Sequence, residues 1–572
     1  MADGSGLTWE APGKGTWELD LAHVPRPLTP YLCELYSEPS GRGFRESIPK
    51  YGVLLQGLDI RTVNGLFYSQ AIPVGGGGSK LPPKLLFKLA VALHPEIRKR
   101  RKVAKTAFED KPWRDDLRMW QQEVKPQIRE VQARLAAVDV ARLDEDQLLA
   151  HLEACRQSHT QMIYWHHYFD IAALAPLADF LAHAKEWTNQ PLADLFKLLK
   201  GSSRASAGSN EELDRLLAAL ERRPDAIDAL RSSAPPEDRL RDLLAADGEL
   251  GEAARAYLEL VGPRVVDGYD IDSPTVAEMP QLVIDGILAK PQQDEGSVVE
   301  GHIAEMEARV PPEHRALFSQ LLADTRMTYG LRDERGLYTD ITAAGIVRKA
   351  VLELGSRLLE RGRLEAANDI FEASYGEMKD LVAAAGPTKD ELARRRTSRA
   401  GLRVEQAPPY LGGEPGPIPP AEWFPDDLQR IFKAQTVVLD LLYDQGSTIK
   451  GGSTIKGLAV SGGIYEGTAR LIDGPNELHR LEQGDVLVTR STSAAFNICL
   501  HLLGAMVTDR GGLLSHSAIV AREYGIPGVV GCGVATSEIP DGARVRVDGD
   551  RGEITVLSAP AGSGRKEAAA AV

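Results

Sequence analysis

Residues 507–531 read VTDRGGLLSHSAIVAREYGIPGVVG, and this stretch decides the fold of the last part of the chain. The apolar residues up to Thr508 indicate a strand, and the paired glycines after it permit a tight turn. Ser515 is the type of residue that caps a helix, so we expect a helix to begin at His516 and to end before Gly525. Since a second short strand follows the helix, the stretch predicts an α/β unit.

His516 is the residue of this stretch that we expect to carry chemistry. At the N-terminus of a helix, a side chain faces free backbone N–H groups and the positive end of the helix dipole. That environment disfavours an imidazolium and favours an anion bound to the ring. The position therefore predicts a neutral, nucleophilic histidine that is suited to carrying a phosphoryl group.

The same stretch resembles the phosphohistidine signature of a swivelling domain. Residues 511–531 are similar to the motif shared by phosphoenolpyruvate synthase, pyruvate phosphate dikinase, rifampin phosphotransferase and phenylphosphate synthase, which belong to the PEP-utilising enzymes. The resemblance extends over residues 457–557 and includes Val460–Gly463, Gly467–Arg470 and Asp541–Gly549. It implies that His516 is the residue that becomes phosphorylated.

A second segment that resembles this family lies upstream, at Leu487–Phe496, and reads LVTRSTSAAF. By the resemblance, Thr492 falls on the threonine that contacts the histidine or its phosphate. Ala494 and Phe496 stand where the family usually has proline and tryptophan. We expect further support for the phosphate from Thr508, Gly512, Ser515, Ser517 and Arg522.

Short β-branched segments bounded by Gly, Pro, Asp or Asn surround these motifs. They lie at residues 468–472, 485–489, 505–508, 528–531, 544–548 and 553–557. The pattern and the resemblance predict a C-terminal α/β (β/β/α) swivelling phosphohistidine domain at residues 458–558. The last residues, 559–572, are small, polar and rich in alanine, so we expect them to be disordered.

The chain over residues 85–442 has a helical period instead. Residues 113–138, for example, place apolar side chains at spacings of three and four, and we expect Pro126 to kink or divide that helix. Residues 303–322 are expected to form another helix. We therefore predict a mostly α-helical acceptor domain over residues 1–400.

Residues 401–457 are expected to connect the two domains. Six prolines in the first part of this segment indicate a linker or a chain that crosses a surface, whereas residues 426–443 have the spacing of one helix. The hexapeptide GSTIKG then occurs twice in succession, at 446–451 and 452–457. A repeated Gly/Ser/Thr segment is typical of a flexible spacer, so we expect a hinge there.

Residues 1–440 also resemble the helical acceptor domain of rifampin phosphotransferase and part of the large subunit of phenylphosphate synthase. The motifs are Gly262–Arg264, Asp272–Glu278, Tyr329–Arg335, Arg348 with Leu354–Gly355, and Gly362–Leu364 with Asn368–Phe371. In this family an ATP-grasp domain phosphorylates the histidine, and the sequence shows no such domain. We also expect no handling of phosphoenolpyruvate, because only about 15 residues follow the swivelling domain and a TIM barrel needs at least about 200.

These features predict a phosphotransferase subunit of the phosphoenolpyruvate synthase and phenylphosphate synthase type. The resemblance implies that a separate ATP-grasp subunit binds ATP and Mg²⁺, passes the β-phosphoryl group to His516 and releases AMP and phosphate, as a dikinase does. The swivelling domain would then deliver the group to a hydroxyl of a small phenol or alcohol. We expect this chain to bind no cofactor tightly and no metal.

Two other functions stay open on the sequence. The same chemistry could activate a hydroxyl for elimination or condensation in the biosynthesis or degradation of small molecules. Alternatively, the chain could be a regulatory phosphocarrier without its own acceptor, which predicts that residues 1–440 enclose no apolar pocket.

Residues that bind or deprotonate the acceptor must come from the helical domain. Tyr164, His166 and His167 combine aromatic surface with candidate general bases, as a pocket for a phenol needs. The alternative is an aromatic helix packed in the core. A charged run supplies candidates for holding the phosphoryl group, unless it forms a solvated ion-pair face: Arg332, Glu334 and Arg335.

The composition limits where the protein acts. Its 572 residues carry a net charge of −14, and an acidic chain is a poor ligand for nucleic acid or an anionic membrane. The N-terminus lacks the pattern of a secretion signal, and no apolar run is long enough to span a bilayer. We therefore expect a cytoplasmic protein without membrane or nucleic-acid partners. The four cysteines show no CxxC spacing, which argues against a zinc site or a disulfide framework.

Overall fold

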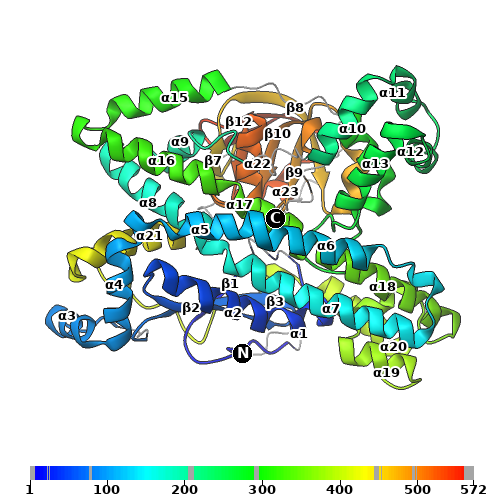
Figure 1. Cartoon of the computed structure of the whole chain (residues 1–572), viewed down its shortest axis with the longest axis horizontal. Coiled ribbons are helices and arrows are strands. Elements are labelled where there is room, and N and C mark those ends of the chain that lie inside the picture. Colours follow the sequence, from blue (N-terminus) through cyan, green and yellow to red (C-terminus); the bar gives the residue numbers. More distant parts are fainter. Residues whose placement is uncertain are drawn as a thin grey trace, which may run out of the picture.

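A computed structural model of the chain describes residues 7–21, 24, 26–76, 80–203, 211–288, 296–443, 450–451, 454–492, 496 and 499–558. Figure 1 shows a large, mostly helical N-terminal unit and a smaller C-terminal unit built on a sheet, which lies against it. The predicted fold class is confirmed, since a mostly α-helical region is followed by a mixed α/β domain.

The N-terminal unit contains a four-stranded antiparallel sheet that the helical pattern did not predict. Its order is β2-β3-β1-β4, with bounds Leu55–Val63, Leu66–Pro73, Trp17–Leu19 and Tyr410–Leu411. Asn64 and Gly65 join β2 to β3 in a two-residue turn, and their φ angles are 51° and 79°. Positive φ at both positions suits the twist of a hairpin, which is why Asn-Gly is favoured there.

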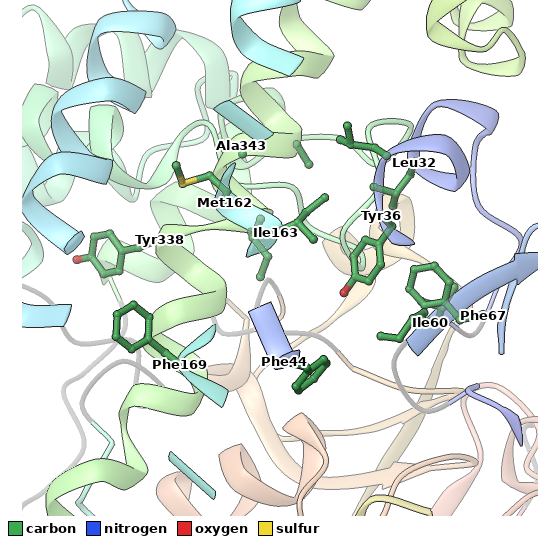
Figure 2. Packing of buried hydrophobic residues seen from close by; sticks show 14 of the residues in the cluster. Leu32, Tyr36, Phe44, Ile60, Phe67, Met162, Ile163, Phe169, Tyr338 and Ala343 are labelled. Atoms are coloured by element: carbon green, nitrogen blue, oxygen red, sulfur yellow. The ribbon is translucent and has the colours of Figure 1, made fainter. Parts of the chain in front are cut away.

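Long helices pack on this sheet and on one another to form the main core. Helix α7 (Glu145–Tyr168) packs against α18 (Asp340–Glu360) and α2 (Ser37–Ser47), and α2 also contacts β2. Figure 2 shows Ile163 and Phe169 among the buried side chains of this core. The other helices here are α1 (Pro30–Leu35), α3 (Lys84–Leu93), α4 (Pro95–Asp110), α8 (Asp170–Thr188), α9 (Leu192–Lys197), α17 (Leu331–Tyr338), α19 (Tyr375–Val382) and α20 (Lys389–Gly401), with 3-10 turns at Ile48–Tyr51, Val140–Arg142 and Ala367–Glu372.

The helix predicted at 113–138 is divided, as expected for Pro126. A turn of π-helix at Trp120–Val124 separates α5 (Pro112–Met119) from α6 (Lys125–Ala136). Proline has no N–H to donate, so it is best accommodated in the first turn of a helix, which is where Pro126 lies in α6.

The single helix predicted at 303–322 is wrong. The segment is broken into α15 (Gly296–Arg309) and α16 (Arg315–Tyr329) by a 3-10 turn at Pro312–His314. Two consecutive prolines, Pro311 and Pro312, remove two backbone donors and force extended backbone before the second proline, which outweighs the apolar spacing.

A smaller helical bundle with its own core extends from the N-terminal unit. Its elements are α10 (Glu211–Glu221), α11 (Pro224–Leu230), α12 (Pro236–Leu244), α13 (Gly248–Val261) and α14 (Pro280–Leu288), with a 3-10 turn at Val276–Glu278. In Figure 1 the C-terminal unit lies between this bundle and the arm formed by α15 and α16. Leu282 of α14 and Phe318 of α16 pack on the C-terminal unit from these two sides.

The proline-rich segment after α20 crosses the N-terminal unit. Strand β4 pairs there with β1, and 3-10 turns lie at Val404–Gln406 and Ala421–Trp423. The helix predicted at 426–443 is confirmed as α21 (Asp426–Tyr443). The predicted hinge lies partly outside the described residues, whereas β5 (Lys450–Gly451) and β6 (Thr454–Lys456) of the repeat join the C-terminal sheet.

The C-terminal unit is built on a nine-stranded sheet in the order β5-β6-β13-β12-β8-β9-β10-β11-β7. The six predicted strands are present, and three further strands, β5, β6 and β7, complete the sheet. Strands β8 to β11 run parallel and β11 pairs with β7 antiparallel. The elements are β7 (Leu458–Ser461), β8 (Ile464–Ile472), β9 (Asp485–Thr489), β10 (Leu503–Thr508), β11 (Gly528–Val530), β12 (Arg544–Asp548), β13 (Glu553–Ser558), α22 (His516–Tyr524) and α23 (Ala535–Glu538), with 3-10 turns at Pro475–Arg480 and Leu500–Leu502.

Two expectations concern the ends and the environment of the chain. Residues 559–572, predicted to be disordered, lie outside the described residues. No helix in the described part of the chain combines the length and apolar character needed to cross a bilayer.

Candidate active site

The loop before helix α22 places His516 as the sequence predicts. Ser515 is the N-cap, and its hydroxyl accepts a hydrogen bond from the Ala518 N–H while it donates to the Gly512 carbonyl. A Cβ on Gly511, whose φ is 120°, would lie 2.7 Å from Ser515 Oγ. The glycine is therefore required for the close turn that carries β10 into the helix.

Thr492 contacts the His516 ring directly. Its Oγ1 lies 2.9 Å from His516 Nδ1 and 3.0 Å from Ser517 Oγ. The loop after β9 and the first turn of α22 are brought together because β9 and β10 are parallel neighbours. This contact fixes the ring orientation and assigns Nδ1 to a hydroxyl partner.

A cavity of about 250 Å³ lies between the two units, and His516 is part of its wall. The N-terminal unit supplies most of the lining, with apolar residues from the sheet, α2, α8 and α21. Tyr36, Phe44, Ile60 and Phe67 form part of this apolar wall, and Figure 2 shows Tyr36, Ile60 and Phe67 grouped together. A largely apolar cavity with a few polar groups is typical of a small-molecule site.

Burial between the units changes the protonation of His516. The pKa of the ring is lowered from 6.5 to about 4, mainly by burial; Asp333 opposes this shift and the positive charge of Arg332 adds to it. The ring is therefore neutral at physiological pH. The neutral state predicted from the helix N-terminus is present, but the main cause is burial.

The positive charge of Arg332, at the edge of the cavity, is only partly balanced by hydrogen-bond partners. Its Nη1 is buried and has no hydrogen-bond partner among the described residues, and burial lowers the pKa of its guanidinium. Arg510 of the C-terminal unit lines the same cavity. A buried, incompletely paired guanidinium next to a histidine is suited to binding an anion such as a phosphoryl group.

A second histidine faces the cavity from α7. His166 Nδ1 lies 3.1 Å from Asp340 Oδ2, and Asp340 is 1% exposed. Arg335 donates hydrogen bonds to the His166 carbonyl and to Asp170 Oδ1, both at 2.6 Å. Burial raises the pKa of Asp340, while the neighbouring histidines His167 and His159 oppose this shift. A carboxylate on one ring nitrogen orients an imidazole so that the other nitrogen can exchange a proton.

Most of the predicted site residues come together at this cavity. The following line it: Thr492, Gly512, Ser515, His516 and Ser517 from the C-terminal unit, and His166, His167, Arg332 and Arg335 from the N-terminal unit. His167 Nε2 also lies 2.9 Å from the Tyr36 hydroxyl. The aromatic helix is thus both packed in the core and exposed to the cavity through its histidines.

Two residues expected to support the phosphate do not line the cavity. Thr508 donates a hydrogen bond to the Arg510 carbonyl and so shapes the loop before the helix. Arg522 donates to the Leu513 carbonyl and to the Tyr329 hydroxyl, and its guanidinium lies 4.5 Å from the centre of the Phe196 ring. Arg522 is the seventh residue of α22 and lies about 240° around the helix axis from His516, so its side chain leaves the helix on another side.

Two acceptor-site candidates also point elsewhere. The Tyr164 hydroxyl donates to Glu46 Oε2 at 2.6 Å, on another face of α7. Glu334 pairs with Lys125 and accepts a hydrogen bond from Trp120 Nε1. These partners lie outside the cavity lining, which separates Tyr164 and Glu334 from His166, Arg332 and Arg335.

The cavity also includes further polar residues, of which the sequence indicated only Asp170, near the aromatic run, and Asp333, in the charged run. They are Asp20, Tyr36, Ser69, Asp170, Tyr269, Asp333, Gln435, Ser491 and Arg510. They come from segments far apart in the chain, so no local spacing could have grouped them. Asp333, Ser491 and Arg510 lie within motifs already noted. The described residues contain no group of three or more His, Cys, Asp or Glu side chains that could hold a metal ion.

Comparisons with known proteins agree with this division. Residues 481–552 match the model of the PEP-utilising enzyme mobile domain, and residues 167–333 match the fourth domain of rifampicin phosphotransferase. The C-terminal unit with its histidine loop thus resembles the mobile domains of PEP-utilising enzymes. Within that group, the combination with the helical region is similar to the arrangement in rifampicin phosphotransferases.

Individual relatives share this similarity over different parts of the chain. Chondramide synthase of Chondromyces crocatus is 28% identical over 96% of the chain and 14% of its own length. A rifampicin phosphotransferase of a Streptomyces species is 29% identical over 54% of the chain and 35% of its length. An uncharacterized phosphotransferase of Bacillus subtilis, YvkC, is 30% identical over 44% of the chain and 29% of its own length. The chain therefore spans about a third or less of the length of these curated relatives.

Proposed function

We propose that this chain transfers a phosphoryl group, carried on His516, to a hydroxyl of a small and largely apolar molecule. The observation that carries the proposal is the position of His516 in the wall of an apolar cavity lined mainly by the N-terminal unit. A carrier histidine and an acceptor pocket are thereby combined in one chain. The similarity to rifampicin phosphotransferases supports the same type of reaction.

Nε2 of His516 is the proposed phosphoryl carrier. In one tautomer, the Nδ1 proton is donated to Thr492 and the Thr492 proton to Ser517, which agrees with their distances of 2.9 and 3.0 Å. In that tautomer Nε2 is the ring nitrogen that carries the lone pair needed for attack on phosphorus. The low pKa of His516 keeps this lone pair available at neutral pH.

The proposed reaction consists of two displacements. In the first, a bond forms between Nε2 and phosphorus while the bond from phosphorus to the donor's leaving oxygen breaks. In the second, the acceptor oxygen attacks phosphorus, the N–P bond breaks, and His516 returns to its neutral form. Arg332 and Arg510 neutralise charge on the phosphoryl oxygens while the cavity positions the acceptor.

His166 is the proposed general base for the acceptor hydroxyl, with Asp340 as its positioning residue. The 3.1 Å electrostatic contact with Asp340 favours a proton on His166 Nδ1, so Nε2 is the nitrogen whose lone pair would take the hydroxyl proton. Gly336 lies beside this ring, and a Cβ there would be 3.6 Å from His166 Cε1. An Asp340→Asn variant should therefore slow transfer to the acceptor without slowing phosphorylation of His516.

The proposed route for the donor is a movement of the C-terminal unit, because the His516 ring lies in the wall of the cavity between the two units. We propose that a separate ATP-grasp subunit binds ATP and Mg²⁺ and passes the β-phosphoryl group to His516, leaving AMP and phosphate. The segment around residues 445–457 is the proposed hinge. The family resemblance supports these steps, and this chain's own residues serve as carrier and acceptor site.

The cavity favours an enzyme over a regulatory phosphocarrier. A carrier without its own acceptor needs no enclosed apolar pocket, whereas a phenol or alcohol with a hydrocarbon body needs one. Whether the phosphorylated hydroxyl is the final product or is activated for elimination or condensation depends on the acceptor. Analysis of the products separates these two cases, because elimination releases free phosphate and a dehydrated molecule.

The carrier step can be tested without knowing the partner. Phosphoramidate, which phosphorylates histidine side chains, should give one acid-labile phosphate on the wild-type chain, and peptide mass spectrometry should locate it at His516. The His516→Ala variant should lack it. No acid-labile phosphate on the wild type, or an equal amount on His516→Ala, would contradict the proposal. A candidate ATP-grasp subunit with ATP labelled at the β-phosphate then tests the charging step.

A further inference from the structure

Helix α3 exposes an unusual number of large apolar side chains. Leu85 is 80% exposed, Leu86 56%, Leu89 54% and Leu93 63%. The described part of the chain has ten exposed large hydrophobic residues, and these four lie on one helix of ten residues. Contiguous exposed apolar surface of this kind marks a binding surface for a membrane or another molecule.

The four leucines share one face of the helix. At about 100° per residue, positions 85, 86, 89 and 93 fall within an arc of about 100°. Phe87 and Val91 lie on the opposite side and hold the helix to the protein. The Phe87 ring contacts Trp423 and Phe424 at centroid distances of 5.5 and 5.2 Å. The leucine face is therefore turned outward by a fixed contact.

Basic residues surround this face. Residues 80–105 contain nine Lys and Arg residues and a single acidic residue, Glu96, in a chain whose net charge is −14. No carboxylate among the described residues pairs with Arg98, Lys102 or Lys105, and all three are exposed. Charge is thus strongly uneven along the sequence, and residues 80–105 carry far more positive than negative side chains.

We propose that α3 and the start of α4 dock the protein on the surface of an anionic lipid bilayer. The leucines would enter the boundary between headgroups and acyl chains, while Lys84 and Lys88 extend to the headgroups and the basic residues of α4 bind anionic lipid. Figure 1 shows α3 at the edge of the molecule, where a flat surface can reach it. The net charge of the whole chain does not prevent this, because charges beyond about 10 Å are screened at physiological salt.

The composition of the face favours lipid over a protein partner. Protein interfaces are depleted in lysine and depend on Trp, Tyr and Arg anchors. Here the leucines are flanked by Lys80, Lys84 and Lys88, and the one aromatic residue, Phe87, is turned toward the protein. Nucleic acid is disfavoured because it offers no apolar phase for four leucines.

Vesicle sedimentation tests the proposal. The full chain should bind phosphatidylcholine vesicles that contain about 30% phosphatidylserine and should bind pure phosphatidylcholine vesicles at least about tenfold more weakly. Raising the salt from about 0.1 M to about 0.5 M should weaken the binding strongly. The same assay with Leu86→Ser/Leu89→Ser and with Lys84→Glu/Lys88→Glu should show a loss of at least about tenfold for each variant.

The matched control is Ile418→Ser, because Ile418 is 57% exposed but lies in the proline-rich segment. It should bind as the wild type does, and circular dichroism should show the same folded state for all variants. No binding of the wild type to the anionic vesicles would overturn the proposal, as would equal binding by the leucine variant. A wild-type oligomer that Leu86→Ser/Leu89→Ser converts to a monomer would also overturn it, since the face would then be a contact between copies of the chain.

Discussion

Arg332 and Asp333 are adjacent residues that act on His516 with opposite signs. The positive charge of Arg332 lowers the pKa of His516 and the negative charge of Asp333 raises it, in addition to the larger effect of burial. An Arg332→Gln variant should therefore raise the pKa of His516 from about 4 by up to about one unit. Titration of the His516 ring by NMR measures this. Asp333→Asn is the control and should not raise the pKa; a rise in both variants would mean that the cavity had opened to water instead.

Thr492 should be essential for the orientation of the carrier histidine. A Thr492→Val variant keeps the shape of the side chain but removes the hydroxyl that joins His516 Nδ1 to Ser517. Loss of such an orienting partner typically costs about 10-fold to 100-fold in activity, so phosphorylation by phosphoramidate should slow by that factor. Thr492→Ser should retain most of the rate. Equal rates in wild type and Thr492→Val would show that the hydroxyl does not act on the ring.

The predictability of the site differs between its two sides. The carrier side could be predicted because its residues are contiguous: Gly512, Ser515 and His516 follow from turn and capping chemistry. The acceptor side could be predicted only in part. Local residue chemistry indicated His166 and Arg335. Tyr36 could not be predicted, because it lies far from His167 in the sequence and contacts it only in the folded chain.

At the scale of elements, the hairpin of β2 and β3 shows how a local signal can be missed. Asn64-Gly65 between two strand-like runs is a strong hairpin signature, but it lies outside residues 85–442, whose helical period is the basis for predicting a mostly α-helical domain. The break at Pro311-Pro312 shows the same effect, since apolar spacing continues across it. Helical periodicity predicts that helices exist but is a poor guide to where they end.

A Gly65→Ala variant tests the hairpin. Gly65 has a φ of 79°, and an added Cβ would lie 3.2 Å from Pro27 Cβ and 3.3 Å from the Leu28 nitrogen. The free energy of unfolding should fall by about 1 kcal/mol or more, measured by denaturant titration. Gly301→Ala is the matched control, because Gly301 lies in α15 with open space around it and alanine favours helix. Equal stability of the two variants would argue against the strained turn.

At the scale of the whole molecule, helix α22 holds the two units together beyond its first turn. Ile519 packs in one cluster with Phe196 and Phe318 of the N-terminal unit. Arg522 contacts Tyr329 and Phe196, and Glu523 Oε2 accepts a hydrogen bond of 2.8 Å from the Gly201 N–H. Helix α22 thus begins with the carrier histidine and ends in the contacts that dock the C-terminal unit. If the C-terminal unit undocks, these contacts break and His516 leaves the cavity at the same time.

Two titratable groups of α22 are buried by this docking, with opposite effects on protonation. Burial raises the pKa of Glu523 from 4.5 to about 7 and lowers the pKa of His516 from 6.5 to about 4. Between about pH 4.5 and pH 6.5, docking therefore adds a proton to Glu523 and removes one from His516. The two changes nearly cancel, so the docking equilibrium of the wild type should vary little with pH in this range.

A Glu523→Gln variant should remove this compensation. Only the His516 contribution then remains, and because the pKa of His516 is lowered by docking, docking is fully stable above pH 6.5 and weakens as the pH falls toward 4. The docking constant should fall by about tenfold between about pH 7.5 and pH 5.5, measured by energy transfer between labels on the two units. His516→Asn should have the opposite dependence: its docking is most stable below pH 4.5 and weakens as the pH rises through about 7. If neither variant changes the pH dependence, the two groups remain exposed to solvent in the docked state and the units do not close over His516.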